Sequence, residues 1–386
     1  MMLKTLTSCL LTVGATSLVG VIAPAQAFTP LSLTQTFNNP SPAGFDYFGN
    51  SVSVSGTLAL IGAYQDDTGA SDAGSAYLFD TTTGNLLKTF NNPSPAGFDY
   101  FGYSVSLSGT SALIGANLDD TGASNAGSAY LFDTTTGALL KTFNNPSPAD
   151  FDQFGNSVSV SGTSALIGAF QDDTGASDAG SAYLFDTTTG ALLQTFNNPS
   201  PASFDYFGYS VSLSGTSALI GAFQDDTGAS NAGSAYLFDT TTGALLKTFN
   251  KPTPASGDNF GYSVSVSGTS ALIGAFQDDT GASDAGSAYL FNTTTGALLQ
   301  TFNNPTPADF DGFGNSVSLS GTSALIGANQ DSTGATYAGS AYLYQEPQEV
   351  QAVPEPSTIL GIGVVLGALP VLRKKDVKSN KKKVVQ

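Results

Sequence analysis

Short apolar runs separated by turn residues recur along most of the chain. Val52 and Val54 alternate with serines, which is the period of a half-buried β-strand. Residues 58–61 and 76–79 are apolar at every position, which is typical of strands covered on both faces. Residues 86–90 form a further apolar segment. One stretch of chain therefore predicts four short strands and no helix.

The same stretch is repeated six times. The dipeptide Phe-Gly recurs every 53 residues, with its phenylalanines at Phe48, Phe101, Phe154, Phe207, Phe260 and Phe313. A period of about 50 residues with four strands per unit is typical of a β-propeller. A β-solenoid is the alternative, but its coils are usually shorter. We therefore predict an all-β, six-bladed β-propeller of four-stranded blades over residues 28–345, rather than several unrelated domains.

The ends of the repeated body indicate how such a ring would close. Residues 31–37 match the fourth segment of a unit, 86–90, whereas the body ends at 340–344, which match a third segment. An N-terminal strand that completes the last blade would close the ring. It would also remove the exposed strand edges that an open array leaves.

Composition excludes several kinds of chemistry. The 386 residues carry a formal net charge of −18, so nucleic acid is not an expected partner. There is no histidine and no tryptophan, and the one cysteine, Cys9, lies in an N-terminal leader. Histidine-based acid–base catalysis, thiol chemistry, disulfides and Cys/His zinc sites are therefore excluded from the mature chain.

The leader, residues 1–27, is predicted to be a secretory signal peptide. It has an early positive charge at Lys4, an apolar stretch over 10–22 and an A-x-A cleavage site at Ala25 and Ala27. The alternative is an N-terminal membrane helix, which the small residues at the exit of the stretch disfavour. Cleavage would start the mature chain near Phe28.

The C-terminal end of the chain has the features of a protein-sorting signal. A linker over 346–356 precedes a short apolar segment over 357–372 and a basic tail over 373–386. With Pro354, Glu355 and Pro356 in the linker, this order resembles the PEP-CTERM sorting signal of exported bacterial proteins. The resemblance implies transient membrane insertion, recognition by an exosortase-type enzyme, removal of the tail and delivery to the cell surface or extracellular matrix. An uncleaved tail anchor is the alternative.

The repeated unit also resembles a known family. Phe48-Gly49, then Gly62-Ala63, then the run from Gly74 to Tyr77 resemble the FG-GAP repeat of integrin-type propellers, and more closely its bacterial variants. That resemblance implies a β-propeller used in adhesion and ligand binding. Tyr64 stands where the Gly-Ala-Pro triplet has proline, and the turn at 55–57 is too short for the calcium loop of integrin-type repeats.

The long loops should share one face of the propeller, the long-loop face, which carries residues 65–73, 91–100 and their equivalents. The opposite face should carry the short turns at 55–57 and 80–84. Of the 26 aspartates of the body, 22 fall on the long-loop face, with Lys251 as its only cation, which gives a formal charge of −21. Such a face should attract cations or basic partners.

The loop at 66–72 is the candidate metal site. Its acidic residues in the first and third repeats are Asp66, Asp67, Asp72, Asp172, Asp173 and Asp178. Calcium prefers several carboxylate and carbonyl oxygens on a glycine-containing turn, so calcium is the one cofactor we consider. The favoured alternative is that these aspartates cap the loop by hydrogen bonds to its backbone.

These features predict an exported, non-enzymatic adhesion or structural binding module, with an extracellular polysaccharide or surface protein as its partner. A cation-dependent carbohydrate-binding module is the first alternative. A carboxylate-based hydrolase is the second, because Asp172 and Asp173 are paired carboxylates. Six near-identical units do not provide the unique constellation that an active site needs. Phe45 and Phe48 could stack on sugars, although packing between blades is the expected role of both.

Overall fold

The computed structural model describes residues 35–333 and 336–345, and every regular element in these ranges is a β-strand. No helix in this part of the chain has the length and apolar character needed to span a bilayer. The predicted signal peptide, the Pro354-Glu355-Pro356 motif, the apolar segment at 357–372 and the basic tail lie outside the described residues.

Six antiparallel sheets follow one another along the chain, and we call them blades 1 to 6. Blade 1 contains β1 (Val52–Ser55), β2 (Leu58–Ala63), β3 (Ser75–Asp80) and β4 (Leu86–Asn91). Blade 2 contains β5 (Phe101–Ser108), β6 (Ser111–Ala116), β7 (Ser128–Asp133) and β8 (Leu139–Asn144). Blade 3 contains β9 (Ser157–Ser161), β10 (Ser164–Ala169), β11 (Ser181–Asp186) and β12 (Leu192–Asn197).

The second half of the body repeats this order. Blade 4 contains β13 (Phe207–Ser214), β14 (Ser217–Ala222), β15 (Ser234–Asp239) and β16 (Leu245–Asn250). Blade 5 contains β17 (Phe260–Ser267), β18 (Ser270–Ala275), β19 (Ser287–Asn292) and β20 (Leu298–Asn303). Blade 6 contains β21 (Phe313–Ser320), β22 (Ser323–Ala328) and β23 (Ser340–Tyr344).

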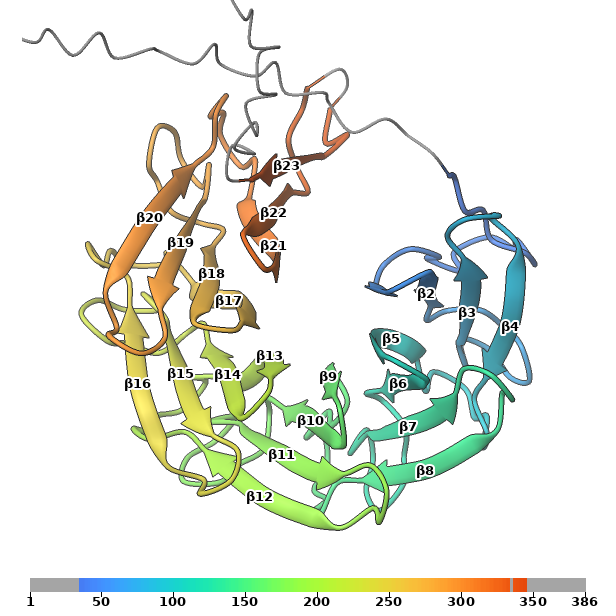
Figure 1. Cartoon of the computed structure of the whole chain (residues 1–386). Helices are drawn as coiled ribbons and strands as arrows, with labels where there is room; N and C mark the ends of the chain where they lie inside the picture. The colour runs from blue at the N-terminus through green and yellow to red at the C-terminus, as the bar shows by residue number, and fades with distance from the viewer. Residues whose placement is uncertain (1–34, 334–335, 346–386) are drawn as a thin grey trace, which may run out of the picture. The chain divides into compact units, whose positions relative to one another are not determined.

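The blades lie around a common centre in an arc that is open between blade 6 and blade 1, with the first strand of each blade nearest to the centre (Figure 1). This arrangement confirms the predicted six-bladed propeller of four-stranded antiparallel sheets. Blade 6 has three strands within the described residues. The predicted closing strand, 31–37, falls mostly outside them, and its described part, 35–37, forms no strand.

Glycines let the backbones of neighbouring blades touch. A Cβ on Gly62 in β2 would overlap the carbonyl oxygen of Gly102 in β5, and one on Gly74 would overlap that of Phe101. At the same junction the amide of Phe101 donates to the carbonyl of Ala73 at 3.0 Å. The Phe-Gly, Gly-Ala and Gly-Ser motifs of the repeat therefore meet at one seam, where only residues without a side chain fit.

Serines of the first strands hold successive blades together near the centre. The hydroxyl of Ser51 accepts a hydrogen bond from the amide of Val105 at 3.0 Å, and that of Ser53 from Leu107 at 2.9 Å. The first strand of a blade has no backbone partner on the side that faces the centre. In blades 2 to 6, serine hydroxyls of the preceding blade accept hydrogen bonds from its free amides, which is a second reason for the alternation of serine with valine.

The hydrophobic core lies between the blades rather than within any one of them. The junction of blades 1 and 2 packs Leu60, Leu78 and Phe90 against Phe101 and Phe132, all of them buried. The Phe90 and Phe132 rings lie 4.9 Å apart. Burying a side chain of this size contributes roughly 1.5–3 kcal/mol, so stability comes mainly from the junctions.

The faces of blades 1 and 6 that have no neighbouring blade are only partly covered by other described residues. Val52 of blade 1 is 63% exposed, whereas its counterpart Val158 in blade 3 is 7% exposed. Leu325 of blade 6 is 44% exposed, although its counterpart Leu272 in blade 5 is fully buried. Phe37 packs on blade 1 with its ring 4.9 Å from that of Phe79, as Phe90 does on Phe132 one repeat later.

We expect blade 6 to pack on blade 1 in solution, and Leu325→Ala tests this expectation. If the junction forms, the substitution should lower the free energy of unfolding by about 2–5 kcal/mol, because it leaves a cavity in a buried core. Leu272→Ala, at a junction already in place, is the matched control. Urea unfolding of both variants gives the comparison. A cost below about 0.5 kcal/mol for Leu325→Ala alone would show that the two blades stay apart.

Candidate functional site

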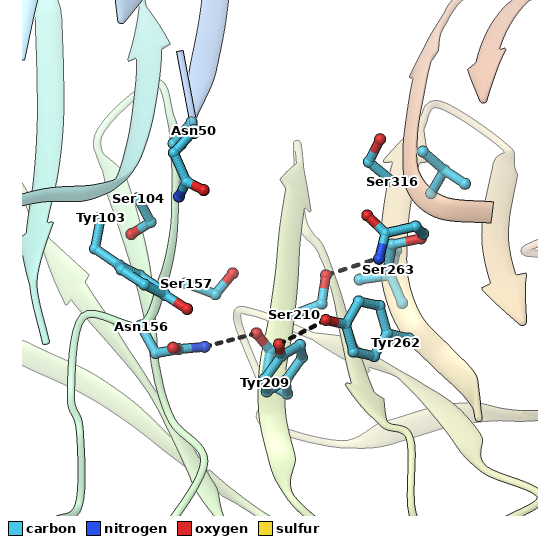
Figure 2. Close-up of a pocket in the computed structure, with 14 residues that line it drawn as sticks. Asn50, Tyr103, Ser104, Asn156, Ser157, Tyr209, Ser210, Tyr262, Ser263 and Ser316 are labelled. Atoms are coloured by element: carbon cyan, nitrogen blue, oxygen red, sulfur yellow. Dashed lines mark hydrogen bonds between the residues drawn. The ribbon is translucent and has the colours of Figure 1, made fainter. Parts of the chain in front are cut away.

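A cavity of about 310 Å³ lies between the first strands of the six blades. One residue at the same repeat position in every blade lines it, namely Asn50, Tyr103, Asn156, Tyr209, Tyr262 and Asn315. The serine that follows each of them lines it as well, and Figure 2 shows side chains from both sets around the cavity. None of the described residues that form its wall is charged. We call this cavity the axial site.

The start of each first strand explains how these side chains come to face the centre. In blade 4, Phe207 is buried in the core and Gly208 follows with φ of 93°. The pairing with β14 shifts register between Phe207 and Ser210. Such a bulge redirects the side chain that follows it, so that Tyr209 lines the cavity.

Hydrogen bonds fix two of the three tyrosines of the axial site. The Tyr209 hydroxyl donates to that of Tyr262 at 2.9 Å, and the Asn156 amide nitrogen donates to the carbonyl of Tyr209 at 3.1 Å (Figure 2). Burial raises the pKa of Tyr209 far above its usual value and also raises that of Tyr103. Both phenols are therefore neutral hydrogen-bonding groups at physiological pH.

Aromatic rings back these tyrosines. They occupy the position directly after the Gly-Ala pair, where the Gly-Ala-Pro triplet would have proline. Phe223 lies 4.7 Å from Tyr209, and Phe276 lies 4.3 Å from Tyr262, measured between ring centroids. The departure from the family motif therefore has a structural role, because it supplies the second layer of the axial site.

Four of the six predicted calcium-loop carboxylates accept hydrogen bonds, whereas Asp72 and Asp178 take part through their backbone amides. Asp66 accepts from the Thr68 amide at 2.9 Å and from the hydroxyl of Tyr77, and Asp67 accepts from the Asp72 amide at 2.9 Å. The third repeat places Asp172, Asp173 and Asp178 in the same roles. Among the described residues no three acidic, histidine or cysteine side chains are grouped so that they could hold a metal ion. Calcium binding at these loops stays a prediction.

Burial changes the electrostatics of the long-loop face. Twelve of its 22 aspartates are buried, two in each repeat, so that fewer carboxylates meet solvent than the formal charge suggests. One of the two is of the Asp66 type. The other, exemplified by Asp99, accepts at 2.7 Å from the Asn92 amide nitrogen and at 2.7 Å from the Ala96 amide. Burial, with Asp119 nearby, raises the pKa of Asp99 to about 6.

Lys251 replaces this asparagine in the loop that enters blade 5. It is buried, and its ammonium lies 2.8 Å from Asp258 and 3.0 Å from Asp278. Burial acts to raise the pKa of Asp278, but hydrogen bonds from Thr280, Tyr289 and Lys251 outweigh it and lower the pKa. The only cation predicted for the long-loop face is thus an internal counter-ion rather than a surface charge.

Phenylalanines stand exposed on the loops that enter the blades. Phe45, Phe98, Phe151, Phe204 and Phe310 are each more than half exposed, with φ between 67° and 71°. The equivalent residue before blade 5 is Gly257, with φ of 83°. A non-glycine residue in this conformation costs roughly 1–2 kcal/mol. We call the five residues the exposed phenylalanine set.

The two phenylalanines considered from the sequence thus differ. Phe48 packs on its own blade, with its ring centroid 5.8 Å from that of Tyr77 and 6.2 Å from that of Phe79, so packing between blades stays a prediction for it. Phe45 is 81% exposed, so the expectation that it packs between blades is wrong. Because its backbone lies in the left-handed region, its side chain turns away from the core.

Comparison with known proteins follows the repeats. A sequence model described as the FG-GAP repeat matches residues 40–79, 94–132, 147–185, 199–238, 253–291 and 307–344. No curated protein sequence matches the chain. The chain is similar to the crystal structure of the computationally designed protein Ika8, with 14% sequence identity, a TM-score of 0.45, and coverage of 76% of this chain and 70% of that one.

The buried aspartates predict an unusual pH dependence. Burial raises the pKa of Asp99, Asp152 and Asp205 to about 6 from an ordinary value of 3.8. Folding then favours the protonated form, so the stability that these groups contribute is complete below their ordinary pKa and is lost as the pH rises through about 6. The melting temperature should therefore rise when the pH falls from about 8 to about 5.

The sequence of blade 5 supplies the control. Replacing Asn92, Asn145 and Asn198 by lysine, as at Lys251, puts an ammonium beside each raised carboxyl group. The triple variant should show a flatter pH profile in thermal melts. Aspartates with a lowered pKa, such as Asp80 beside the Thr83 amide, lose their contribution only below their ordinary value and do not affect this window. A melting temperature that falls on acidification would contradict the assignment.

Calcium should have no specific effect, because the Asp66-type carboxylates are already bonded within the loop. We expect calcium and magnesium at equal ionic strength to shift the melting temperature equally and slightly. Six real sites would instead add about 1.4 kcal/mol each at a tenfold excess over Kd. A large calcium-specific rise that disappears when Asp67 and its counterparts Asp120, Asp173, Asp226 and Asp279 are all replaced by asparagine would establish the metal site.

Proposed function

The chain belongs to the FG-GAP repeat family, and we propose that it is a non-enzymatic binding module that works outside the cell, at the cell surface or in the extracellular matrix. FG-GAP propellers suit an extracellular binding role, because they present many similar loops on one rigid face. Export through cleavage after Ala27, and sorting through Glu355 and its flanking prolines, are parts of this proposal. These two steps determine where the protein is located and not what it binds.

The exposed phenylalanine set is the observation that carries this proposal. Five large apolar side chains face solvent in a backbone conformation that favours glycine, and the equivalent position before blade 5 holds glycine. Such side chains add no core contact and cost conformational energy, and outliers of this kind cluster at binding sites. One exposed aromatic side chain before each of five blades would give a multivalent surface for adhesion.

The partner we propose is an extracellular polysaccharide or a surface protein. Aromatic rings stack on the apolar faces of sugars and also anchor protein interfaces, so the phenylalanines serve either partner. The two differ in salt dependence. A basic protein held by the remaining exposed aspartates would dissociate at high ionic strength, whereas a neutral polysaccharide would remain bound.

Absence of catalysis is the other part of the proposal. The paired carboxylates considered for hydrolysis have structural partners, since Asp172 bonds to Thr174 and Tyr183 and Asp173 bonds to the Asp178 amide. The same arrangement occurs in each of the first five repeats, so no pair is distinguished by its surroundings as a general acid and base must be.

Replacing all five members of the exposed phenylalanine set by glycine tests the function. The variant should bind extracellular matrix or cell surface of its host at least about tenfold more weakly, because the anchors are gone. Its melting temperature should be unchanged or higher, because glycine relieves the backbone strain. Pull-down of labelled protein, with a thermal melt of the same sample, measures both.

The matched control removes as many exposed apolar side chains from the outer strands. Leu87, Leu140, Leu193, Leu246 and Leu299 are exposed, one in each four-stranded blade, and their replacement by serine should leave binding intact. Equal binding by the glycine variant and the unmodified protein would remove the support for an adhesive long-loop face.

A further inference from the structure

We propose that the axial site binds one small, uncharged, hydroxyl-rich molecule of the size of a mono- or disaccharide. This inference rests on the proposed function, because it assigns a ligand class to a binding module. Its site is separate from the exposed phenylalanine set, which lies on the loops before the first strands. The cavity volume of about 310 Å³ is at the lower end of the range of roughly 300–1,000 Å³ that is usual for small-molecule sites.

The wall of the site determines the ligand class. Phenol, amide and hydroxyl groups converge from all six blades, and they can both donate and accept hydrogen bonds. Every hydroxyl group of a sugar can likewise both donate and accept hydrogen bonds. An ion would enter without a counter-charge, because no carboxylate or cation lines the cavity, and an uncompensated ion pays a large desolvation cost. The excess of aspartate in the body disfavours anions further.

The site is preorganised. The Tyr209 hydroxyl is held by that of Tyr262, and their rings lie 4.9 Å apart. Phe223 contacts both tyrosines, with ring centroids 4.7 and 5.2 Å away, so the rings have little freedom to move. A rigid aromatic wall gives a flat surface for the apolar face of a sugar ring, and little side-chain entropy is lost when the ligand binds.

The axial site is also where the repeats differ. A site within a blade or between blades would recur around the propeller, whereas the centre is single. Tyrosine lines it in blades 2, 4 and 5, and asparagine lines it in the other three, although the neighbouring Phe-Gly and serine are the same in all. The wall is therefore asymmetric, and it should hold one ligand in one orientation. The expected stoichiometry is one molecule per chain.

Titration of the full-length protein with simple sugars tests the inference. The chain has no tryptophan, and three of its 15 tyrosines line the site, so a part of its tyrosine fluorescence comes from the site, and calorimetry gives the affinity and the stoichiometry. The probes are glucose, galactose, mannose and maltose at millimolar concentrations. Glucuronic acid is the negatively charged control for glucose, and choline is a positively charged control that could contact the aromatic wall. We expect at least one neutral sugar to bind at one molecule per chain, and the two charged probes to bind more weakly.

Two variants test the location. Tyr209→Phe removes a hydroxyl but keeps the ring, and it should weaken sugar binding by about tenfold. Tyr209→Asn installs the residue that blade 3 carries there, so the fold tolerates it, and it should weaken binding at least as much. Tyr337→Phe is the control, because Tyr337 is 61% exposed and is not part of the cavity wall. Its sugar affinity should be unchanged.

Several results would overturn the inference: no binding of any neutral sugar, a stoichiometry of several sugars per chain, tighter binding of glucuronic acid or choline, or a Tyr209→Phe variant that binds as well as the unmodified protein. The outcome is separable from that of the proposed function. Loss of matrix binding in the five-glycine variant tests the long-loop face alone. Matrix binding that persists while no sugar binds would reject only the axial site.

Discussion

Direct contact between the backbones of neighbouring blades is the constraint on which the rest of the structure depends. At each seam Gly62 and Gly74, or their equivalents, lie against the Phe-Gly pair of the next blade so closely that no Cβ fits between them. This contact fixes where the first strand of the next blade starts. Its phenylalanine then enters the core, the residue after the glycine faces the centre, and the serines reach the amides of the following strand.

Much of this architecture could be predicted from the sequence, because the signals are local and are repeated. The 53-residue period, the turn residues and the apolar runs of 58–61 and 76–79 are visible in one unit. The sequence shows the seam glycines as a motif. It does not show why glycine is needed at these positions, because the atoms that exclude a side chain belong to the next repeat. The structure supplies that reason, since the carbonyls of Phe101 and Gly102 occupy the space.

The axial site was harder to predict, because its residues come from different repeats. Tyr209 and Tyr262 are 53 residues apart and meet only because the first strands converge on one centre. One signal was available, namely the change between asparagine and tyrosine two residues after each Phe-Gly phenylalanine. The aspartates could be counted from the sequence, but their burial could not, since Asp66 and Asp99 are covered by their own loops. Asp66 shows that a pattern of aspartates typical of calcium ligands also occurs where carboxylates accept hydrogen bonds from the backbone of their own loop.

Near-identical seams have a consequence for how the chain assembles. Any blade presents a surface that any other blade can accept, so the seams themselves carry little information about which neighbour is correct. Covalent connection must supply that information, because the loop entering each blade joins it directly to the preceding repeat and holds it there at a millimolar effective concentration. The order of the blades is therefore protected by proximity along the chain, and a longer loop at any junction would favour exchange of blades between molecules at high protein concentration.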